Sequence, residues 1–147
     1  MARAFTRAAR WPIARFMGKP FEMRFVAEAD DIDIMGHVNN AVWVRWMEAI
    51  ATAHWQALAP AEAQALYAWV VTRHEIDYRG NVVQGEAVIA RTHVAEPPRG
   101  ARFDRLIEFI GEDGKAKVSA RTTWAMVEIE SRRLMRVPAN LAAIFLG

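Results

Sequence analysis

Cysteine is missing from this sequence, and its absence removes several kinds of chemistry at once. The chain can form no disulfide, offers no thiol nucleophile and cannot build a cysteine-ligated metal site. Its four histidines are dispersed without metal-ligand spacing, so no metal is expected. No uninterrupted run of about 18 apolar residues occurs, which predicts that no helix spans a membrane. Glycine-rich phosphate loops and the setting of a serine nucleophile are also missing.

What the sequence does contain is the composition of an ordinary globular protein. Its 147 residues are 53% hydrophobic and 24% charged, which argues against disorder. A chain of this length is suited to one domain with its own core. We therefore expect a single globular unit and look for its boundaries in the charge pattern.

The positive charge is concentrated at the N-terminus. The first 24 residues hold six basic side chains and one acidic one, whereas the remainder holds 13 basic and 16 acidic. We predict a basic extension over residues 1–19, which packs on the body or on a neighbouring subunit, and a domain over residues 20–147. A role of the extension at a membrane surface or an anionic partner stays open, but no nucleic-acid partner is expected.

The first half of the domain reads as a strand followed by a long helix. Apolar residues alternate with charged ones from Phe21 onward, which is typical of a half-buried strand. From residue 41 apolar residues recur at three- and four-residue steps, with Asn39 or Asn40 as the N-cap and Pro60 beyond the end. The helix is apolar over most of its circumference, so it should be buried.

The second half reads as strands. Residues 68–78, 87–95, 102–110 and 115–129 are rich in β-branched and aromatic residues and are separated by turn sequences; a short helix follows over 138–146. We predict an α+β fold in which these four strands form an antiparallel meander, and a five-stranded antiparallel sheet wraps around one central helix. Val118, Trp124 and Met126 are assigned to the outer face of that sheet, where a second copy would cover them.

Most of the chemical information lies in residues 31–40, just before the predicted helix. Asp31, Asp33 and His37 stand where free backbone N–H groups and the helix dipole favour negative charge. Such a loop suits stabilisation of an oxyanion while a carboxylate attacks or activates water. The other interpretation is structural: both acids cap the loop, and His37 is a turn residue.

The run Asp31-x-Asp33-x-Met-Gly-His-Val-Asn-Asn40, followed by an aromatic residue, Arg45 and Glu48, resembles the hotdog-fold acyl thioesterases. It is similar to the 4-hydroxybenzoyl-CoA thioesterase-like family over residues 21–138. The resemblance implies the hotdog fold and hydrolysis of an acyl-CoA thioester. It also implies Asp33 as the catalytic nucleophile or general base, and a backbone N–H at or near Asn40 as the oxyanion donor.

Further site residues come from the same resemblance. His37 matches a histidine in the loop of plant acyl-carrier-protein thioesterases, although Met35 stands where that loop has asparagine, so His37 is either catalytic or structural. Gly36 and Val38, inside the motif, are predicted to contact substrate. Arg79 is a candidate for the phosphates of coenzyme A. The other basic candidates are Arg99, Arg102 and Lys115.

Two more histidines are interpreted from their positions. His74 is predicted to share a strand face with Val70, Thr72, Ile76 and Tyr78 and to line a pocket shared across a dimer, or else to be buried. His54 lies on the apolar face of the helix and is interpreted as a core histidine.

The predicted protein is a cytoplasmic acyl-CoA thioesterase without a cofactor. Its substrate is carried by coenzyme A or an acyl carrier protein, and it forms a homodimer or homotetramer. The alternative is a non-catalytic hotdog protein that binds an acyl thioester or a protein partner.

Overall fold

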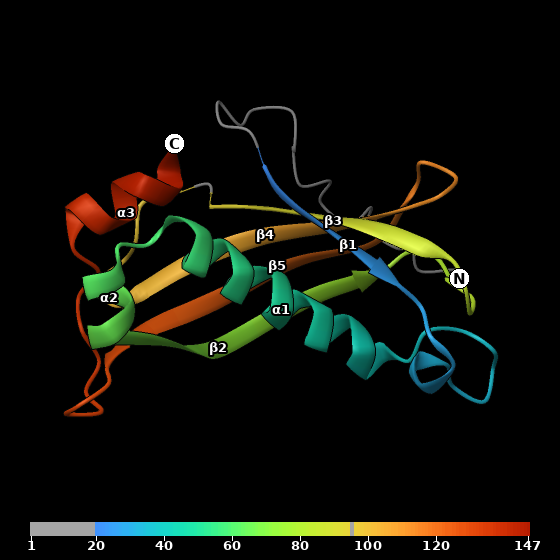
Figure 1. The fold of residues 1–147 in the computed structure, drawn as a ribbon, viewed down its shortest axis with the longest axis horizontal. Coiled ribbons are helices and arrows are strands. Elements are labelled where there is room, and N and C mark those ends of the chain that lie inside the picture. The colour runs from blue at the N-terminus through green and yellow to red at the C-terminus, as the bar shows by residue number, and fades with distance from the viewer. Residues whose placement is uncertain (1–19, 95) are drawn as a thin grey trace, which may run out of the picture.

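The computed structural model describes residues 20–94 and 96–147 (Figure 1). The strands are β1 (Phe21–Val26), β2 (Tyr67–Tyr78), β3 (Ala87–His93), β4 (Arg102–Gly111) and β5 (Ala116–Glu128); the helices are α1 (Asn40–Leu58), α2 (Ala61–Leu66) and α3 (Ala139–Leu146), with a short 3-10 turn η2 (Ala29–Asp31). The predicted extension over residues 1–19, and Ala95 at the predicted end of the third strand, lie outside the described residues.

The long helix α1 begins and ends where the sequence predicts. Asn39 is its N-cap, and the Asn39 side-chain oxygen accepts a hydrogen bond from the N–H of Ala41 at 3.0 Å. The helix ends at Leu58, two residues before Pro60. α1 lies across one face of the sheet (Figure 1), and its buried side chains share a hydrophobic cluster with residues of the strands. The arrangement confirms the predicted α+β architecture of one sheet with a central helix.

The strand order corrects one part of the prediction. The sheet runs β1-β3-β4-β5-β2 with every pair antiparallel, so β3, β4 and β5 form a meander. The expected pairing of β2 with β3 is wrong, because β2 pairs with β5 along its whole length, from Tyr67 opposite Glu128 to Tyr78 opposite Val118. The cause is α1, which crosses the sheet and delivers the chain to the edge opposite β1 (Figure 1).

A bulge in β2 changes which of its residues face the helix. The register shifts between Val71 and Arg73, so Thr72 is an extra residue without a cross-strand partner. Before the bulge Trp69 shares the helix side of the sheet; after it His74 and Ile76 do. The prediction that Val70 and Thr72 lie on the same face as His74 is therefore wrong, because strict alternation does not pass through a bulge.

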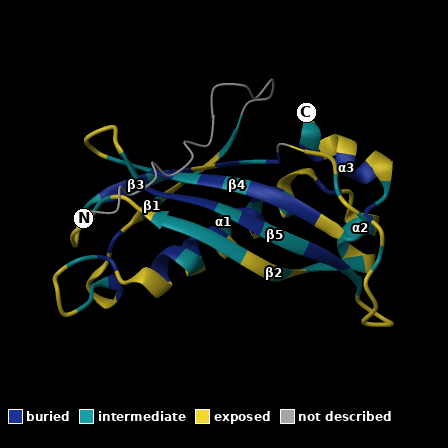
Figure 2. Cartoon of the chain, turned by 180° about the vertical axis from the view of Figure 1, so that it is seen from behind, coloured by how far each residue is buried: buried dark blue, intermediate teal, exposed yellow. Residues whose placement is uncertain are grey.

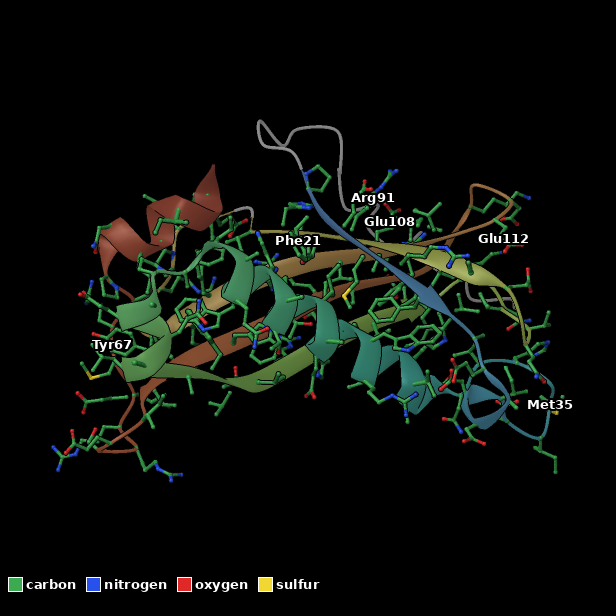
Figure 3. The ribbon with its side chains drawn as sticks, in the orientation of Figure 1. Phe21, Met35, Tyr67, Arg91, Glu108 and Glu112 are labelled. Atoms are coloured by element: carbon green, nitrogen blue, oxygen red, sulfur yellow. The ribbon has the colours of Figure 1, made fainter. Side chains whose placement is uncertain are left out.

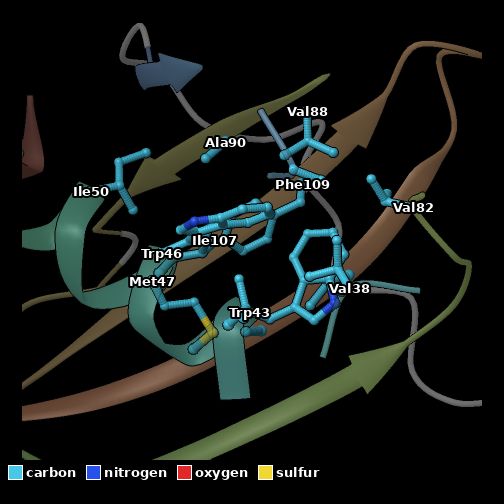
Figure 4. Packing of buried hydrophobic residues seen from close by; sticks show 14 residues of the cluster. Val38, Trp43, Trp46, Met47, Ile50, Val82, Val88, Ala90, Ile107 and Phe109 are labelled. Atoms are coloured by element: carbon cyan, nitrogen blue, oxygen red, sulfur yellow. The ribbon is translucent and has the colours of Figure 1, made fainter. Parts of the chain in front are cut away.

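The main core lies between α1 and the sheet (Figure 4). Trp43 packs edge-to-face on Phe109 with ring centroids 5.1 Å apart, and Trp46 stacks on Phe25 at the same distance. Figure 2, from behind the sheet, shows buried residues along the interior strands β4 and β5. The aromatic rings account for much of the area that holds α1 in place.

The residues that the sequence assigned to the outer face of β5 do not lie there. Val118 pairs with Phe109 and is fully buried under α1, and Met126 is fully buried in a second cluster. Trp124 pairs with Phe103 and is half-buried on the same side. The assignment was wrong because the even-numbered residues of β5 face the helix. Their pairing with the inward residues of β4 determines this orientation.

The second cluster lies at the C-terminal end of α1. There α3 covers the same face of the sheet and packs Leu141, Ala142 and Phe145 onto Phe103 and Met126. The predicted helix at the end of the chain is thus part of the core.

Candidate active site

The loop between η2 and α1 carries the predicted catalytic residues, and its first acid is structural. Asp31 is buried, and its carboxylate accepts hydrogen bonds from the Arg45 guanidinium at 2.5 Å and from the N–H of Glu28 at 2.9 Å. Its backbone carbonyl accepts the N–H of Asn39 at 2.9 Å. Asp31 therefore fixes both ends of the loop to the start of α1.

Asp33 is held differently, by the backbone alone. Its Oδ1 accepts the N–H of Met35 at 2.9 Å and that of His37 at 3.3 Å, and its own N–H donates to the His37 carbonyl at 2.8 Å. Within residues 20–94 and 96–147 no hydrogen bond engages Oδ2. The half-buried carboxylate is thus oriented through one oxygen while the other is available to a reactant.

The turn that follows depends on Gly36. Its φ of +80° lies in the left-handed region that favours glycine, and its N–H donates to the Asp33 carbonyl at 3.0 Å. The turn pushes two apolar side chains into solvent, Ile34 at 101% and Met35 at 74% exposure. Val38 behaves oppositely: its side chain is in the core, and its N–H donates to the Val82 carbonyl at 2.9 Å.

The loop leads directly into the first turn of α1. The N–H groups of Ala41 and Val42 both donate to Asn39, whereas within the described part of the chain the N–H of Asn40 has no acceptor. The Asn40 carbonyl accepts the Tyr78 hydroxyl at 3.4 Å, which ties the helix start to the end of β2. The exposed Asn40 N–H is the kind of donor that can stabilise an oxyanion.

His74 and Arg79 lie apart from this loop. His74 is half-buried on the helix side of β2, where its Nδ1 is 3.1 Å from the Thr122 hydroxyl; burial lowers its pKa, and the charge of Glu48 partly offsets this. Arg79 forms an ion pair with Asp77 at 3.6 Å on the opposite face of the sheet. The structure therefore groups Asp33, Gly36 and His37 with the helix start and separates both of the other residues from them.

The structure adds a feature that the sequence reasoning missed. A cavity of about 300 Å³ lies at the other end of α1, and the buried Arg105 lines it. The sequence carries one sign of it, the alternation of β4. Arg105 occupies an inward position of this strand, between Phe103 and Ile107. A charged residue at such a position is the exception that this pattern makes visible.

Fold and loop together define a hotdog-type protein with an acid-bearing loop before its central helix. The sequence profile of the thioesterase-like superfamily matches residues 27–145. The chain therefore belongs to the thioesterase-like superfamily, which confirms the predicted resemblance and the prediction of a thioester hydrolase. No curated protein sequence matches it significantly.

Solved structures show the same fold at low sequence identity. The Staphylococcus aureus hypothetical protein SAV2348, in complex with CoA, is 13% identical with a TM-score of 0.77, and the match covers 86% of this chain and 81% of that one. An acyl-ACP thioesterase from Bacteroides thetaiotaomicron is 24% identical with a TM-score of 0.73, over 85% of this chain and 52% of that one. The probable thioesterase YbaW from Escherichia coli is 17% identical with a TM-score of 0.71, over 84% and 95%.

Two kinds of feature are absent from the described residues. No helix in residues 20–94 and 96–147 has the length and apolarity to cross a membrane. Over the same ranges, no three histidine, aspartate or glutamate side chains are grouped as metal ligands.

Proposed function

We propose that this protein hydrolyses an acyl-CoA thioester at the loop before α1, with Asp33 as the carboxylate catalyst. The observation that carries the proposal is the hydrogen bonding of Asp33: two backbone N–H groups orient Oδ1, and Oδ2 is left for the reaction. A fixed carboxylate beside a free helix N-terminal N–H is the arrangement that acyl transfer requires.

The chemistry at this loop would begin with polarisation of the thioester carbonyl. The Asn40 N–H donates to the carbonyl oxygen and stabilises the negative charge that develops there. Asp33 then either attacks the carbonyl carbon to form an anhydride, which water opens, or takes a proton from the attacking water. Both routes consume one water and release the free acid and the thiol. His37, whose N–H binds Asp33, is proposed to orient the carboxylate.

Of the remaining predicted residues, Gly36, His74 and Arg79 are proposed to contact the substrate. The predicted contact of Val38 is not among them, because its side chain is buried in the core. Gly36 gives the acyl thioester close access to the backbone, and Val38 supports the loop from the core. A coenzyme A bound at the loop would extend along the end of β2, where Tyr78 reaches Asn40 and Arg79 follows to meet its phosphates. His74 would lie farther along the same strand. The proposed location of the reaction is the cytoplasm.

We also propose that the working unit is at least a homodimer. β2 is a 12-residue strand at the edge of the sheet, so its outer hydrogen-bonding groups are available to a second copy. Antiparallel pairing along β2 would place Tyr67 of one copy beside Tyr78 of the other. The exposed Ile34 and Met35 next to the proposed site also favour coverage by a partner. Light scattering at micromolar concentration should give the mass of a dimer or tetramer; a monomer would contradict this proposal.

The test of catalysis compares two acids of the same segment. Asp33→Asn keeps the size of the side chain and removes its charge, and thiol release from a panel of acyl-CoAs should fall roughly 10²–10⁴-fold. Asp30→Asn is the matched control, because Asp30 is exposed in η2. This variant should hydrolyse the acyl-CoAs at the wild-type rate. Undiminished turnover in Asp33→Asn would overturn the proposed role. Acyl-CoA binding without thiol release by the wild type would favour the non-catalytic alternative.

A further inference from the structure

The cavity at the C-terminal end of α1 is large enough for a small organic molecule. Its volume is about 300 Å³, and α1, α3 and the inward faces of β2, β4 and β5 contribute to its walls. The walls are mainly aromatic, from Trp55, Tyr67, Trp69, Phe103, Trp124 and Phe145. A cavity of this size with aromatic walls and few polar groups is typical of ligand pockets.

Two charged residues belong to this wall, Asp104 and Arg105, and the one without an ion pair among the described residues is Arg105. It is 8% exposed, and its Nη1 contacts His54 Nδ1 at 2.8 Å and the Thr92 hydroxyl at 3.0 Å. Burial, with the nearby Arg105 charge, lowers the pKa of His54 to about 4, so the imidazole is neutral at pH 7 and accepts the hydrogen bond. Both partners of the guanidinium are thus uncharged.

The charge of Arg105 has no counter-ion among the described residues. No carboxylate of residues 20–94 and 96–147 forms an ion pair with its guanidinium. Asp104 also lines the cavity, but its carboxylate is engaged by Arg99, Arg121 and Thr123. Burial lowers the pKa of Arg105 to about 10, which still leaves it protonated at pH 7. A buried cation without an anion is costly, because its charge is removed from water without compensation.

Unused hydrogen-bond donors reinforce this electrostatic mismatch. Within the described residues, Nε and Nη2 of Arg105 have no acceptor, although the guanidinium carries five N–H donors in all. The indole N–H of Trp124, another residue of the cavity wall, is also buried with no acceptor in the described part of the chain. Among the described residues, the remaining N–H donors of Arg105 and the indole N–H of Trp124 are therefore left without matching acceptors, and the positive charge of Arg105 is left without a carboxylate of its own.

We propose that this cavity binds an organic monocarboxylate, with its carboxylate on Arg105 and its apolar body between the aromatic side chains. A carboxylate supplies the missing charge and acceptors, and it matches the planar donor fork of a guanidinium. A single cation in mainly apolar walls suits a monoanion with a hydrophobic body better than a multiply charged, strongly hydrated phosphate. The inference concerns binding alone and does not depend on catalysis at Asp33.

The experiment measures binding of sodium benzoate and sodium octanoate to the full-length protein by calorimetry, beside benzamide and octanamide. Each amide has nearly the shape of its acid but no charge. We expect at least one of the two carboxylates to bind at least tenfold more tightly than its amide. Equal affinity of acid and amide in both pairs, or no detectable binding of either carboxylate, would overturn the proposal.

Two variants locate that binding. Arg105→Gln should weaken the preferred carboxylate at least tenfold and leave its amide unchanged. Since this change could also disturb folding, Ala51→Leu provides an independent test: Ala51 lines the cavity from α1, and leucine fills space there while keeping Arg105. It should weaken the carboxylate severalfold. Full affinity in folded Arg105→Gln and in Ala51→Leu would place the binding elsewhere and overturn the proposal. Asp33→Asn should bind as the wild type does, which separates this result from the fate of the proposed catalysis.

Discussion

The two ends of α1 present opposite environments. At the N-terminal end, an exposed loop holds a carboxylate through backbone N–H groups, beside a helix N–H without an acceptor. At the C-terminal end, aromatic side chains line a cavity with a buried guanidinium that has no counter-ion among residues 20–94 and 96–147. Met35 and Tyr67 mark the two ends in Figure 3. Asn40 and His54 are 14 residue steps apart along α1, which separates the two ends by roughly 20 Å.

The difference shows how a small fold can hold two kinds of polar site. The loop obtains its geometry locally, from neighbours within a few residues, and water remains close to its charge. The cavity draws His54, Thr92 and Arg105 from three separate segments, and its charge is removed from water. The loop therefore suits a reaction with water, and the cavity suits retention of an anion.

The sharpest test of the loop removes one backbone N–H and controls for the loss of the side chain. Asn40 is the first helical residue, a position that proline accepts, and Asn39 already has the extended φ and ψ that precede a proline. Asn40→Pro should therefore fold but lose the proposed oxyanion donor, with kcat for thioester hydrolysis reduced about 10²–10³-fold. Asn40→Ala keeps the N–H and should retain most of the activity. Equal activity of the two variants would rule out this donor.

The cavity end should respond to acid. In the unfolded chain His54 has a pKa of 6.5, and in the folded protein about 4, so between these values the unfolded state binds a proton that the folded state does not. The contribution of neutral His54 to the free energy of unfolding is therefore fully present above pH 6.5. It falls by about 3 kcal/mol as the pH drops toward 4. Urea unfolding at pH values from 7 to 4 measures the loss.

The control for this acid effect is His54→Gln, which removes the titrating group and keeps a side-chain acceptor near Arg105. His74 and His93, whose pKa values burial also lowers, remain in both proteins. The variant should therefore lose less stability than the wild type over the same pH range. Identical losses would show that His54 does not titrate as the cavity geometry requires.

The smallest expected effects concern the ion pair that supports the loop. Asp31→Asn weakens the contacts of this buried side chain with the Glu28 N–H and with Arg45, and it should cost about 1–3 kcal/mol of unfolding free energy. Arg45→Ala should cost less than about 1 kcal/mol, because the arginine side chain is 65% exposed. Urea unfolding of both variants gives the order, and an equal or larger loss from Arg45→Ala would reverse it.

The parts of the molecule that depend on near neighbours could be predicted from the sequence. Asn39 caps the helix through its own side chain, and Pro60 lies just beyond its end. The loop motif is equally local, since Asp33 binds N–H groups two and four residues ahead. Its geometry agrees with the expected site, whereas its catalytic role stays a prediction.

Long-range features escaped the sequence. The pairing of β2 with β5 joins segments about fifty residues apart, and a short-connection rule favoured the wrong neighbour. The contacts of Arg105 reach back to residues 92 and 54, so no local pattern joins the three. Of these features, only the position of Arg105 on the inward side of β4 can be recognised from the sequence pattern.

The extra residue in β2, Thr72, determines which side of the sheet the two halves of this strand present to the helix. Trp69, before Thr72, belongs to the cavity wall, and Ile76, after it, belongs to the core beneath the first half of α1. Trp69 and Ile76 are seven positions apart, and strict alternation over that odd separation would turn one of them away from the helix; the bulge at Thr72 absorbs the extra residue, so both face it. What matters at this position is therefore the number of residues rather than their chemistry. That number keeps the strand residues near both polar sites on one side of the sheet.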